Sequence, residues 1–175
     1  MSILFLTNDL CFDHRPGKRH PERPERLVAV QEGAVLSELG SSLVQVEAET
    51  IDRTAILQVH ENQFIEELEH VDAQGGGRID PDTKMSEHSW KAAQISAGAG
   101  IQAIRELSEG TYEAAFCAVR PPGHHATANQ SMGFCFLNNA AIAAQHLVNI
   151  GHKVLIVDFD AHHGNGTQDI FYEEP

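Results

Sequence analysis

The sequence predicts an α/β fold with a mainly parallel sheet. Short apolar runs of strand length alternate with longer amphipathic stretches along the 175 residues. The last two apolar runs are each followed by a loop rich in Gly and His. Such alternation is typical of helices packed on a sheet, and the length suits one hydrophobic core.

In the amino-terminal part, the apolar runs 3–6 and 43–46 predict strands, and 24–39 is amphipathic and predicts a helix. A further helical region extends through His70. Residues 71–83 contain three consecutive glycines and a proline, which predicts an exposed loop. The next stretch, 87–107, has Ala, Ile and Gly at helical spacing, so we expect a long helix packed closely on a sheet.

Two units of the same plan follow. The run 115–119 predicts a buried strand and 135–149 a helix, with a Pro, Gly and His loop between them. The run KVLIVDFD at 153–160 predicts another strand, and a short helix begins after Thr167. Ligands of open parallel sheets bind beyond the carboxyl ends of the strands, so loops 120–134 and 158–166 are the expected site.

Composition excludes several functions. The chain has 12 Lys and Arg against 25 Asp and Glu, a net charge of −13, which would repel a phosphate backbone and argues against direct nucleic-acid binding. The sequence shows no signal peptide and no membrane-spanning apolar stretch, which favours a cytoplasmic protein. The three cysteines Cys11, Cys117 and Cys135 are far apart, so we expect reduced, mostly buried thiols.

The second loop has residues suited to bind a metal ion. Side chains alternate along an extended strand, so Asp158, Asp160 and His162 project the same way if the strand geometry continues. Asp160 and His162 then offer an oxygen and a nitrogen to zinc or a similar divalent ion, with Asp158 steadying a neighbouring group. The alternative is that Asp158 caps the loop and the histidines are solvated.

The first loop contains the adjacent pair His124 and His125 after a stiff Arg-Pro-Pro-Gly segment. Imidazole titrates near neutrality, so the pair suits a water-activating base and a proton donor, provided that other groups orient the rings. Asp158 and Asn165 are the candidates for that orientation. An isolated His-His pair is a weak signal, and its strength comes from the metal-like loop at the neighbouring strand end.

Three long motifs in these loops resemble the zinc-dependent histone deacetylase and acetylpolyamine amidohydrolase superfamily. They are RPPGHHA at 120–126, GFCFLNNAAIAA at 133–144 and VDFDAHHGNGTQDIFY at 157–172. HPERPERL at 20–27, LQVH at 57–60 and DTKMSEHSWKAA at 82–93 are similar to the amino-terminal half of the family. Asn165 and the string HHGNGTQ resemble class II and bacterial members. The resemblance implies a three-layer arginase/deacetylase-like fold, incomplete here, with residues 1–175 the amino-terminal part of one domain.

The resemblance also implies roles for the metal-like loop. Asp160 and His162 would be two of three zinc ligands, and Asp158 would orient His124. Asp158, Asp160 and His162 also resemble the family's structural monovalent-cation site, which takes an ion such as potassium. Hydrolysis would be metal-assisted, because zinc polarises an acetyl carbonyl.

For the other loops, the resemblance implies that His124 and His125 handle protons, with His125 the main general base and acid and Asn165 its orienting partner. Gly133 and Phe134 would line a narrow channel for an acyl-lysine or acyl-amine stem. The expected substrates are therefore acetyl-lysine or acetylated amines.

Two functional parts of the family have no counterpart in the sequence: the third zinc ligand, an aspartate, and the tyrosine that stabilises the oxyanion. One hypothesis is therefore the amino-terminal part of a zinc amidohydrolase, inactive alone, and the other is a non-catalytic binding module on the same scaffold. An arginase-like two-metal enzyme is a third possibility, but Gly164 stands where that family has a bridging carboxylate.

Three smaller expectations concern the surface. His14 and His20 lie in a Pro- and Arg-rich segment that borders the substrate channel in the resembling family and otherwise reads as a solvated loop. Asp82 is interpreted as a helix cap ahead of the long helix, or alternatively as a rim carboxylate that holds substrate. The strand at 153–159 would be an unpaired sheet edge, so we expect a homo-oligomer formed through that edge.

Overall fold

The computed structural model describes residues 2–173. Its main sheet has three parallel strands in the order β2-β1-β5, and a two-stranded antiparallel sheet is formed by β3 and β4. The strands are β1 (Ile3–Thr7), β2 (Leu43–Glu47), β3 (Gly77–Arg78), β4 (Lys84–Met85) and β5 (Ala114–Cys117). The helices are α1 (Glu25–Leu36), α2 (Arg53–Ile56), α3 (Asn62–Ala73), α4 (Ser89–Ser108), α5 (Asn139–Asn149) and α6 (Asn165–Ile170), with 3-10 turns at Asp9–Asp13 and Gly40–Ser42.

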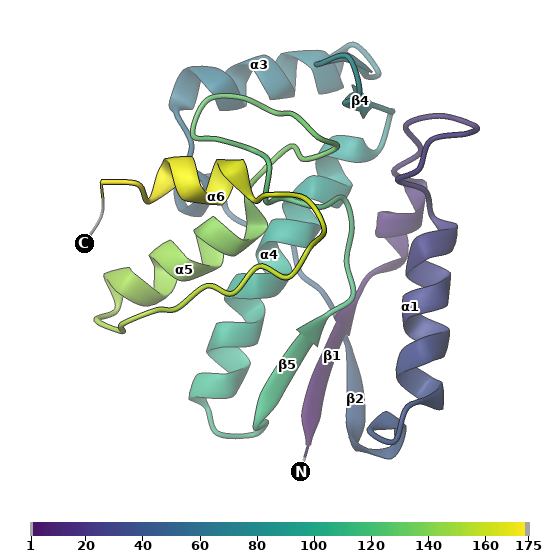
Figure 1. Ribbon diagram of the computed structural model, residues 1–175, viewed down its shortest axis with the longest axis vertical. Helices are drawn as coiled ribbons and strands as arrows, with labels where there is room; N and C mark the ends of the chain where they lie inside the picture. Colours follow the sequence, from purple (N-terminus) through teal and green to yellow (C-terminus); the bar gives the residue numbers. More distant parts are fainter. Residues whose placement is uncertain (1, 174–175) are drawn as a thin grey trace.

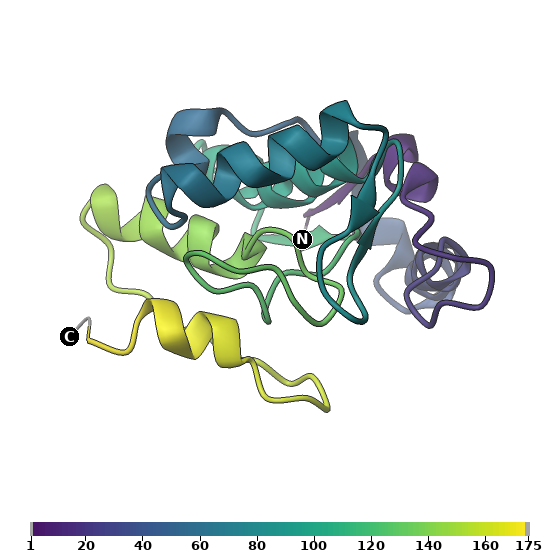
Figure 2. The same cartoon turned by 90° about the horizontal axis from the view of Figure 1, so that it is seen from above.

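The three parallel strands lie between helices, as Figures 1 and 2 show. All five residues of β1 are buried, which is typical of the central strand of a parallel sheet. One buried cluster joins Leu4 and Leu6 of β1 to Leu27 of α1 and Ile95 of α4. The α/β fold with a mainly parallel sheet predicted from the sequence is therefore confirmed.

Helix α4 is the long small-residue helix expected at 87–107, and its glycines explain the close packing. A Cβ atom at Gly98 would lie 2.3 Å from the Glu49 carbonyl oxygen, and one at Gly100 would lie 2.9 Å from the Ala143 Cβ of α5. Side chains larger than hydrogen at these positions would push α4 away from its neighbours.

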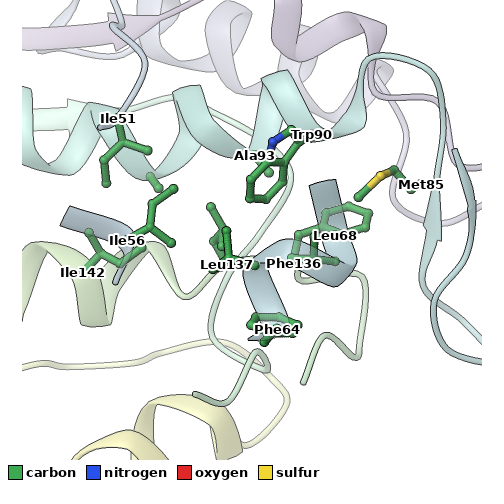
Figure 3. Close-up of a cluster of buried hydrophobic side chains, with 12 residues drawn as sticks. Ile51, Ile56, Phe64, Leu68, Met85, Trp90, Ala93, Phe136, Leu137 and Ile142 are labelled. Atoms are coloured by element: carbon green, nitrogen blue, oxygen red, sulfur yellow. The ribbon is translucent and has the colours of Figure 1, made fainter. Parts of the chain in front are cut away.

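A second hydrophobic cluster lies beneath the loop that joins β5 to α5 (Figure 3). It places Phe136 and Leu137 of that loop against Trp90 of α4, with Phe64 and Leu68 of α3 in the same cluster. Trp90 is 6% exposed. Because the loop's own side chains are part of this core, moving the loop would expose buried apolar surface to water.

Several predicted elements differ from the structure. The strand expected to be buried at 115–119 is β5, none of whose residues is fully buried, and the helix expected after Thr167 begins at Asn165. Two other differences are larger. The predicted helix at 135–149 begins only at Asn139, because the Asn138 side chain accepts the Ala141 N–H and caps α5, while 135–137 are buried in the core. The predicted exposed loop at 71–83 begins inside α3 and then contains β3, which pairs with β4 to form a small hairpin. Strands of two residues are too short for an alternating pattern to show in the sequence.

The predicted strand at 153–160 is wrong. This segment has no strand assignment and does not join the main sheet. In Figures 1 and 2 it connects the end of α5 to α6 and lies apart from the strands of the main sheet. Leu155, Val157 and Phe159 are 86%, 72% and 96% exposed. A continuously apolar strand is stable only when both of its faces are covered. The face that carries Leu155, Val157 and Phe159 is not covered by the described residues.

The sheet edge therefore lies elsewhere than expected. Within residues 2–173, β5 is paired on one side, with β1, and its other side is free. Phe116 of β5 is 49% exposed and stacks on Phe5 at a centroid distance of 5.7 Å. The expected unpaired edge at 153–159 is thus replaced by an edge at β5.

The cysteine prediction is confirmed. Cys11, Cys117 and Cys135 are free thiols, the first and last of them buried. Burial raises the pKa of Cys135 to about 12, so this thiol is protonated and unreactive near neutral pH. Among residues 2–173, none of the helices has the length and apolar character needed to cross a bilayer.

Candidate active site

The tandem histidines lie in the loop that follows β5, on the same side of the molecule as segment 158–166. Their rings are 4.0 Å apart between centroids, and the ring of His125 lies 6.1 Å from that of His162. One surface hollow is lined by His124, Asp158 and Asp160, and an adjoining one by Asp158, Asp160 and His162. The two loops that the sequence marks as a site therefore meet.

Each tandem imidazole has an oxygen partner on Nδ1. His124 Nδ1 donates to Asp158 Oδ2 at 2.8 Å, and His125 Nδ1 donates to Asn165 Oδ1 at 2.6 Å. A neutral ring that donates through Nδ1 has its lone pair on Nε2. Both rings are therefore oriented with a basic Nε2, the arrangement that general acid–base chemistry needs.

The two carboxylates of the second loop are held in their charged forms. The hydrogen bond from His124 lowers the pKa of Asp158 below its ordinary value. The backbone N–H of His162, with its side chain, lowers the pKa of Asp160. Asp158 also accepts the Asp160 N–H at 3.1 Å, so the turn fixes both carboxylates.

Asp160 and His162 are suited in part to bind zinc. The Asp160 Oδ1 and His162 Nδ1 atoms are 3.1 Å apart. Two ligand atoms on a tetrahedral zinc lie about 3.3 Å apart, given bonds of about 2.0–2.1 Å. These two side chains are 50% and 78% exposed, which leaves them open to an ion from solvent. Within residues 2–173, however, no group of three or more His, Cys, Asp or Glu is placed to hold one metal ion.

Glycines let the two loops approach one another. The His124 carbonyl oxygen accepts the N–H groups of Gly166 and Thr167 at 3.0 and 3.2 Å. A Cβ atom at Gly166 would lie 2.3 Å from the Ala126 carbonyl oxygen, and one at Gly164 would lie 2.3 Å from Asp158 Oδ2. The glycines on either side of Asn165 are therefore needed where the chain passes the tandem histidines.

Gly133 and Phe134 form a turn beside His125. Both have positive φ angles, 56° and 70°. A Cβ atom at Gly133 would lie 2.4 Å from Cδ2 of His125, so only glycine leaves room for the ring. The Phe134 ring meets His20 edge-on at 4.5 Å between centroids.

Asp82 and Thr83 hold this turn, a role that the sequence did not reveal. The Gly133 N–H donates to Asp82 Oδ1 at 3.2 Å and the Phe134 N–H donates to Thr83 Oγ1 at 3.0 Å. The helix-cap interpretation of Asp82 is wrong, because α4 begins at Ser89 after an N-cap at His88. No local spacing signals such a contact, since 51 residues separate the partners.

Asn138 and His60 secure the base of the site and were also missed. Asn138 Nδ2 donates to the carbonyl oxygen of Ala126 at 3.0 Å and to Thr167 Oγ1 at 3.1 Å. The Asn138 N–H donates to His60 Nε2 at 3.0 Å. Asn138 therefore joins the tandem-histidine loop to α6, and the hydrogen bond to His60 holds the Asn138 backbone in place. Only the resemblance of 57–60 and 133–144 to family motifs pointed to this region.

Comparison with known proteins gives a consistent result. The family described as histone deacetylase domain matches residues 20–175. The chain is 39% identical over 173 residues to a probable deacetylase of Methanothermobacter thermautotrophicus, covering 98% of the chain and 51% of the relative. It is 35% identical over 190 residues to a histone deacetylase-like amidohydrolase of Pseudomonas aeruginosa, covering 96% of the chain and 49% of the relative.

A solved structure supports the same conclusion. The crystal structure of the HDA15 HD domain superposes with a TM-score of 0.90 at 34% identity, covering 97% of this chain and 49% of the other. The chain thus spans about half the length of these similar proteins.

Proposed function

Because the chain belongs to the histone deacetylase domain family, we propose that it carries half of a zinc-dependent deacetylase site. The reaction would remove acetyl groups from acetyl-lysine or acetylated amines. The observation that supports this proposal is the pair of adjacent imidazoles, each donating through Nδ1 to an oxygen partner beside a carboxylate–imidazole pair.

In this proposal, Asp160 and His162 hold the zinc ion. Zinc, when bound, supplies a Lewis acid that polarises the amide carbonyl. His125, through Nε2, takes the proton from the attacking water and returns one to the leaving amine, and Asn165 keeps its ring oriented. His124, paired with the charged Asp158, supports the same proton transfers. Gly133 and Phe134 border the channel for the acyl-lysine or acyl-amine stem.

The described residues supply two zinc ligands, and we propose that hydrolysis needs a third ligand and an oxyanion donor outside them. An oxyanion donor is typically worth about 10²–10³ in kcat. The second candidate function is a non-catalytic binding module that keeps the scaffold and a weak metal site. The exposed, two-ligand geometry of Asp160 and His162 is the observation that favours it. The predicted structural monovalent cation near Asp158 stays a prediction.

The test combines zinc binding with hydrolysis of an acetyl-lysine reporter by residues 1–175. We expect one weakly bound zinc, lost in Asp160→Ala and in His162→Ala, and kept in the matched control His163→Ala, whose ring is exposed beside His162. We expect little turnover, and His125→Ala should lower any that is measured by about 10² or more.

Zinc binding that survives both Asp160→Ala and His162→Ala would exclude the proposed half-site. If zinc binds but His125→Ala leaves any measured turnover unchanged, the binding module would be favoured. Robust turnover abolished by His125→Ala would show that these residues suffice for catalysis, contrary to our expectation.

We also propose that the chain forms a homodimer through the free edge of β5. The exposed ridge of Leu155, Val157 and Phe159 in one copy can cover the apolar groove between α1 and β5 of the other, because an unpaired edge strand readily accepts another strand.

The net charge of −13 argues against direct nucleic-acid binding, and the free cysteines are consistent with a reducing, cytoplasmic location.

Sedimentation velocity at micromolar concentration should show a dimer for the wild-type chain and a monomer for Leu155→Lys, because a charge on the ridge opposes its burial. Leu36→Lys on α1 is the control, since Leu36 is 85% exposed and Leu155 86%. A wild-type chain that sediments as a clean monomer would contradict the dimer.

A further inference from the structure

A buried ion pair joins the amino-terminal segment to the first residue of the tandem-histidine loop. Arg120 Nε donates to Glu22 Oε1 at 2.7 Å, and Arg120 Nη2 donates to Glu22 Oε2. The two side chains are 5% and 0% exposed. Arg120 Nη1 donates to the carbonyl oxygen of Cys11, so the guanidinium is held on both sides.

His14 extends this network to helix α4. Its Nε2 lies 3.1 Å from Glu22 Oε2, and its Nδ1 lies 2.6 Å from the Ser89 hydroxyl. The ionised Glu22 can only accept, so His14 donates from Nε2, and its Nδ1 accepts the proton of Ser89. Ser89 Oγ in turn accepts the Ser86 N–H and lies 2.8 Å from the Ser86 hydroxyl. Burial lowers the pKa of His14, consistent with a neutral ring. The interpretation of His14 as part of a solvated loop is therefore wrong.

Glu22 is ionised in this setting. Burial alone would raise its pKa, but hydrogen bonds from His14 and Arg120 lower the pKa to about 2. The network therefore contains a buried carboxylate and a buried guanidinium that are hydrogen-bonded to one another, with the more exposed Arg26 guanidinium 3.9 Å from Glu22 Oε1. Such pairs fix geometry more dependably than they add stability, because desolvation offsets most of their attraction.

The loop that Arg120 begins reaches His125 in five residues. The Pro121 carbonyl oxygen accepts from Ser96 Oγ at 2.8 Å and from Asn139 Nδ2 at 3.2 Å, so the residue after Arg120 is held by α4 and α5. The backbone of Gly123 packs so closely that a Cβ there would lie 2.5 Å from the Asn139 N atom. The guanidinium is thus the first of a series of anchors that sets where the tandem imidazoles lie.

We propose that Glu22 and Arg120 are positioning residues that hold the tandem-histidine loop in register with Asp158 and Asn165. The catalytic role of the loop rests on the proposed function, whereas the observed position of the loop does not depend on it. Arg120 fits the role because its planar fork reaches both Glu22 oxygens and the Cys11 carbonyl at once, which a lysine cannot do.

Nitrogen-15 NMR of the histidine rings in the full chain tests this proposal without requiring turnover. In the wild-type chain we expect His124 and His125 as Nδ1–H tautomers. Glu22→Gln alone should lower the denaturation midpoint, because it leaves a buried charge unpaired. The double variant Glu22→Gln, Arg120→Met should recover most of that midpoint, since Gln still accepts from His14 and no buried charge remains.

The tautomers distinguish positioning from simple structural support. If the pair positions the loop, the double variant and Arg120→Lys both fold yet show the mixed tautomers of unrestrained imidazoles. In any form that hydrolyses the reporter, kcat should fall by about 10² with KM little changed. The matched control is the exposed pair Glu49 and Arg105, for which Glu49→Gln, Arg105→Met should leave both tautomers unchanged.

Wild-type tautomers in the folded double variant and in Arg120→Lys would overturn the proposal, because the ion pair would then only support the fold. Zinc binding that survives both Asp160→Ala and His162→Ala would count against the proposed function and leave the NMR result as the test of positioning. The two failures are therefore distinguishable.

Discussion

Replacing Phe136 with alanine is expected to lower the free energy of unfolding by about 3–5 kcal/mol. Phe136 is fully buried and lies in the cluster that Figure 3 shows, with Trp90, Leu68 and Met85. Its ring also meets His14 edge-on at a centroid distance of 5.5 Å. The loss combines the apolar area with the cavity that rigid neighbours would leave, and urea denaturation at pH 7 measures it.

Phe159→Ala is the matched control, since the same ring is removed where it is 96% exposed. At a dilution that keeps the chain monomeric, its effect should stay within about 0.5 kcal/mol. Equal effects of the two substitutions would mean that the loop before α5 is not part of the core in solution.

Acidification from pH 7 to pH 4 is expected to remove about 3 kcal/mol of stability through His60 alone. Burial lowers the pKa of His60 from 6.5 to about 4, with the carbonyl groups of Ala128 and Thr127 acting in the opposite direction. Between these values the unfolded chain binds a proton that the folded chain does not, so stability is complete above about 6.5 and falls as the pH drops. The change in the pKa of His60 from 6.5 to about 4 corresponds to about 3 kcal/mol.

His14 acts in the same direction, because burial lowers its pKa as well. Glu22 acts at lower pH: its pKa falls from 4.5 to about 2, so its contribution is present above 4.5 and is lost only as the pH falls toward 2. The loss between pH 6.5 and 4.5 therefore belongs mainly to the buried histidines.

Urea denaturation at several pH values checks this expectation. In His60→Gln the dependence on pH should be shallower, because an amide oxygen can still accept the Asn138 N–H but does not titrate. The exposed His163 gives the control variant His163→Gln, whose pH profile should match the wild-type chain. An unchanged slope in His60→Gln would show that His60 is not the group responsible.

The fold class could be predicted because its signals are local. The apolar runs that became β1, β2 and β5, and the small residues of α4, have the periods of buried strands and a packed helix. The same logic failed at 153–160, whose pattern is that of a buried strand. A buried strand needs a neighbouring strand to pair with and a packed layer on each face. Among the described residues, this segment has no paired strand.

Much of the candidate site follows from motifs and strand ends. The sequence places His124 and His125 after one apolar run and Asp158 and Asn165 after the next, and in the structure each imidazole meets the partner that the family resemblance implies. Their roles in catalysis stay predictions. Asp82 and Asn138 were not identified as supports, because their contacts connect segments with no shared local pattern.

By itself, the amino-acid sequence determined the α/β class, the strands β1, β2 and β5 with the main helices between them, the free thiols and the loops in which reactive side chains gather. These follow from spacing and side-chain chemistry along a few neighbouring residues. Only the tertiary structure decided that Glu22 pairs with Arg120, 98 residues away, and that the sheet ends at β5. The physical reason is that a buried charge or a strand edge is stabilised by whichever distant segment the folded chain brings to it.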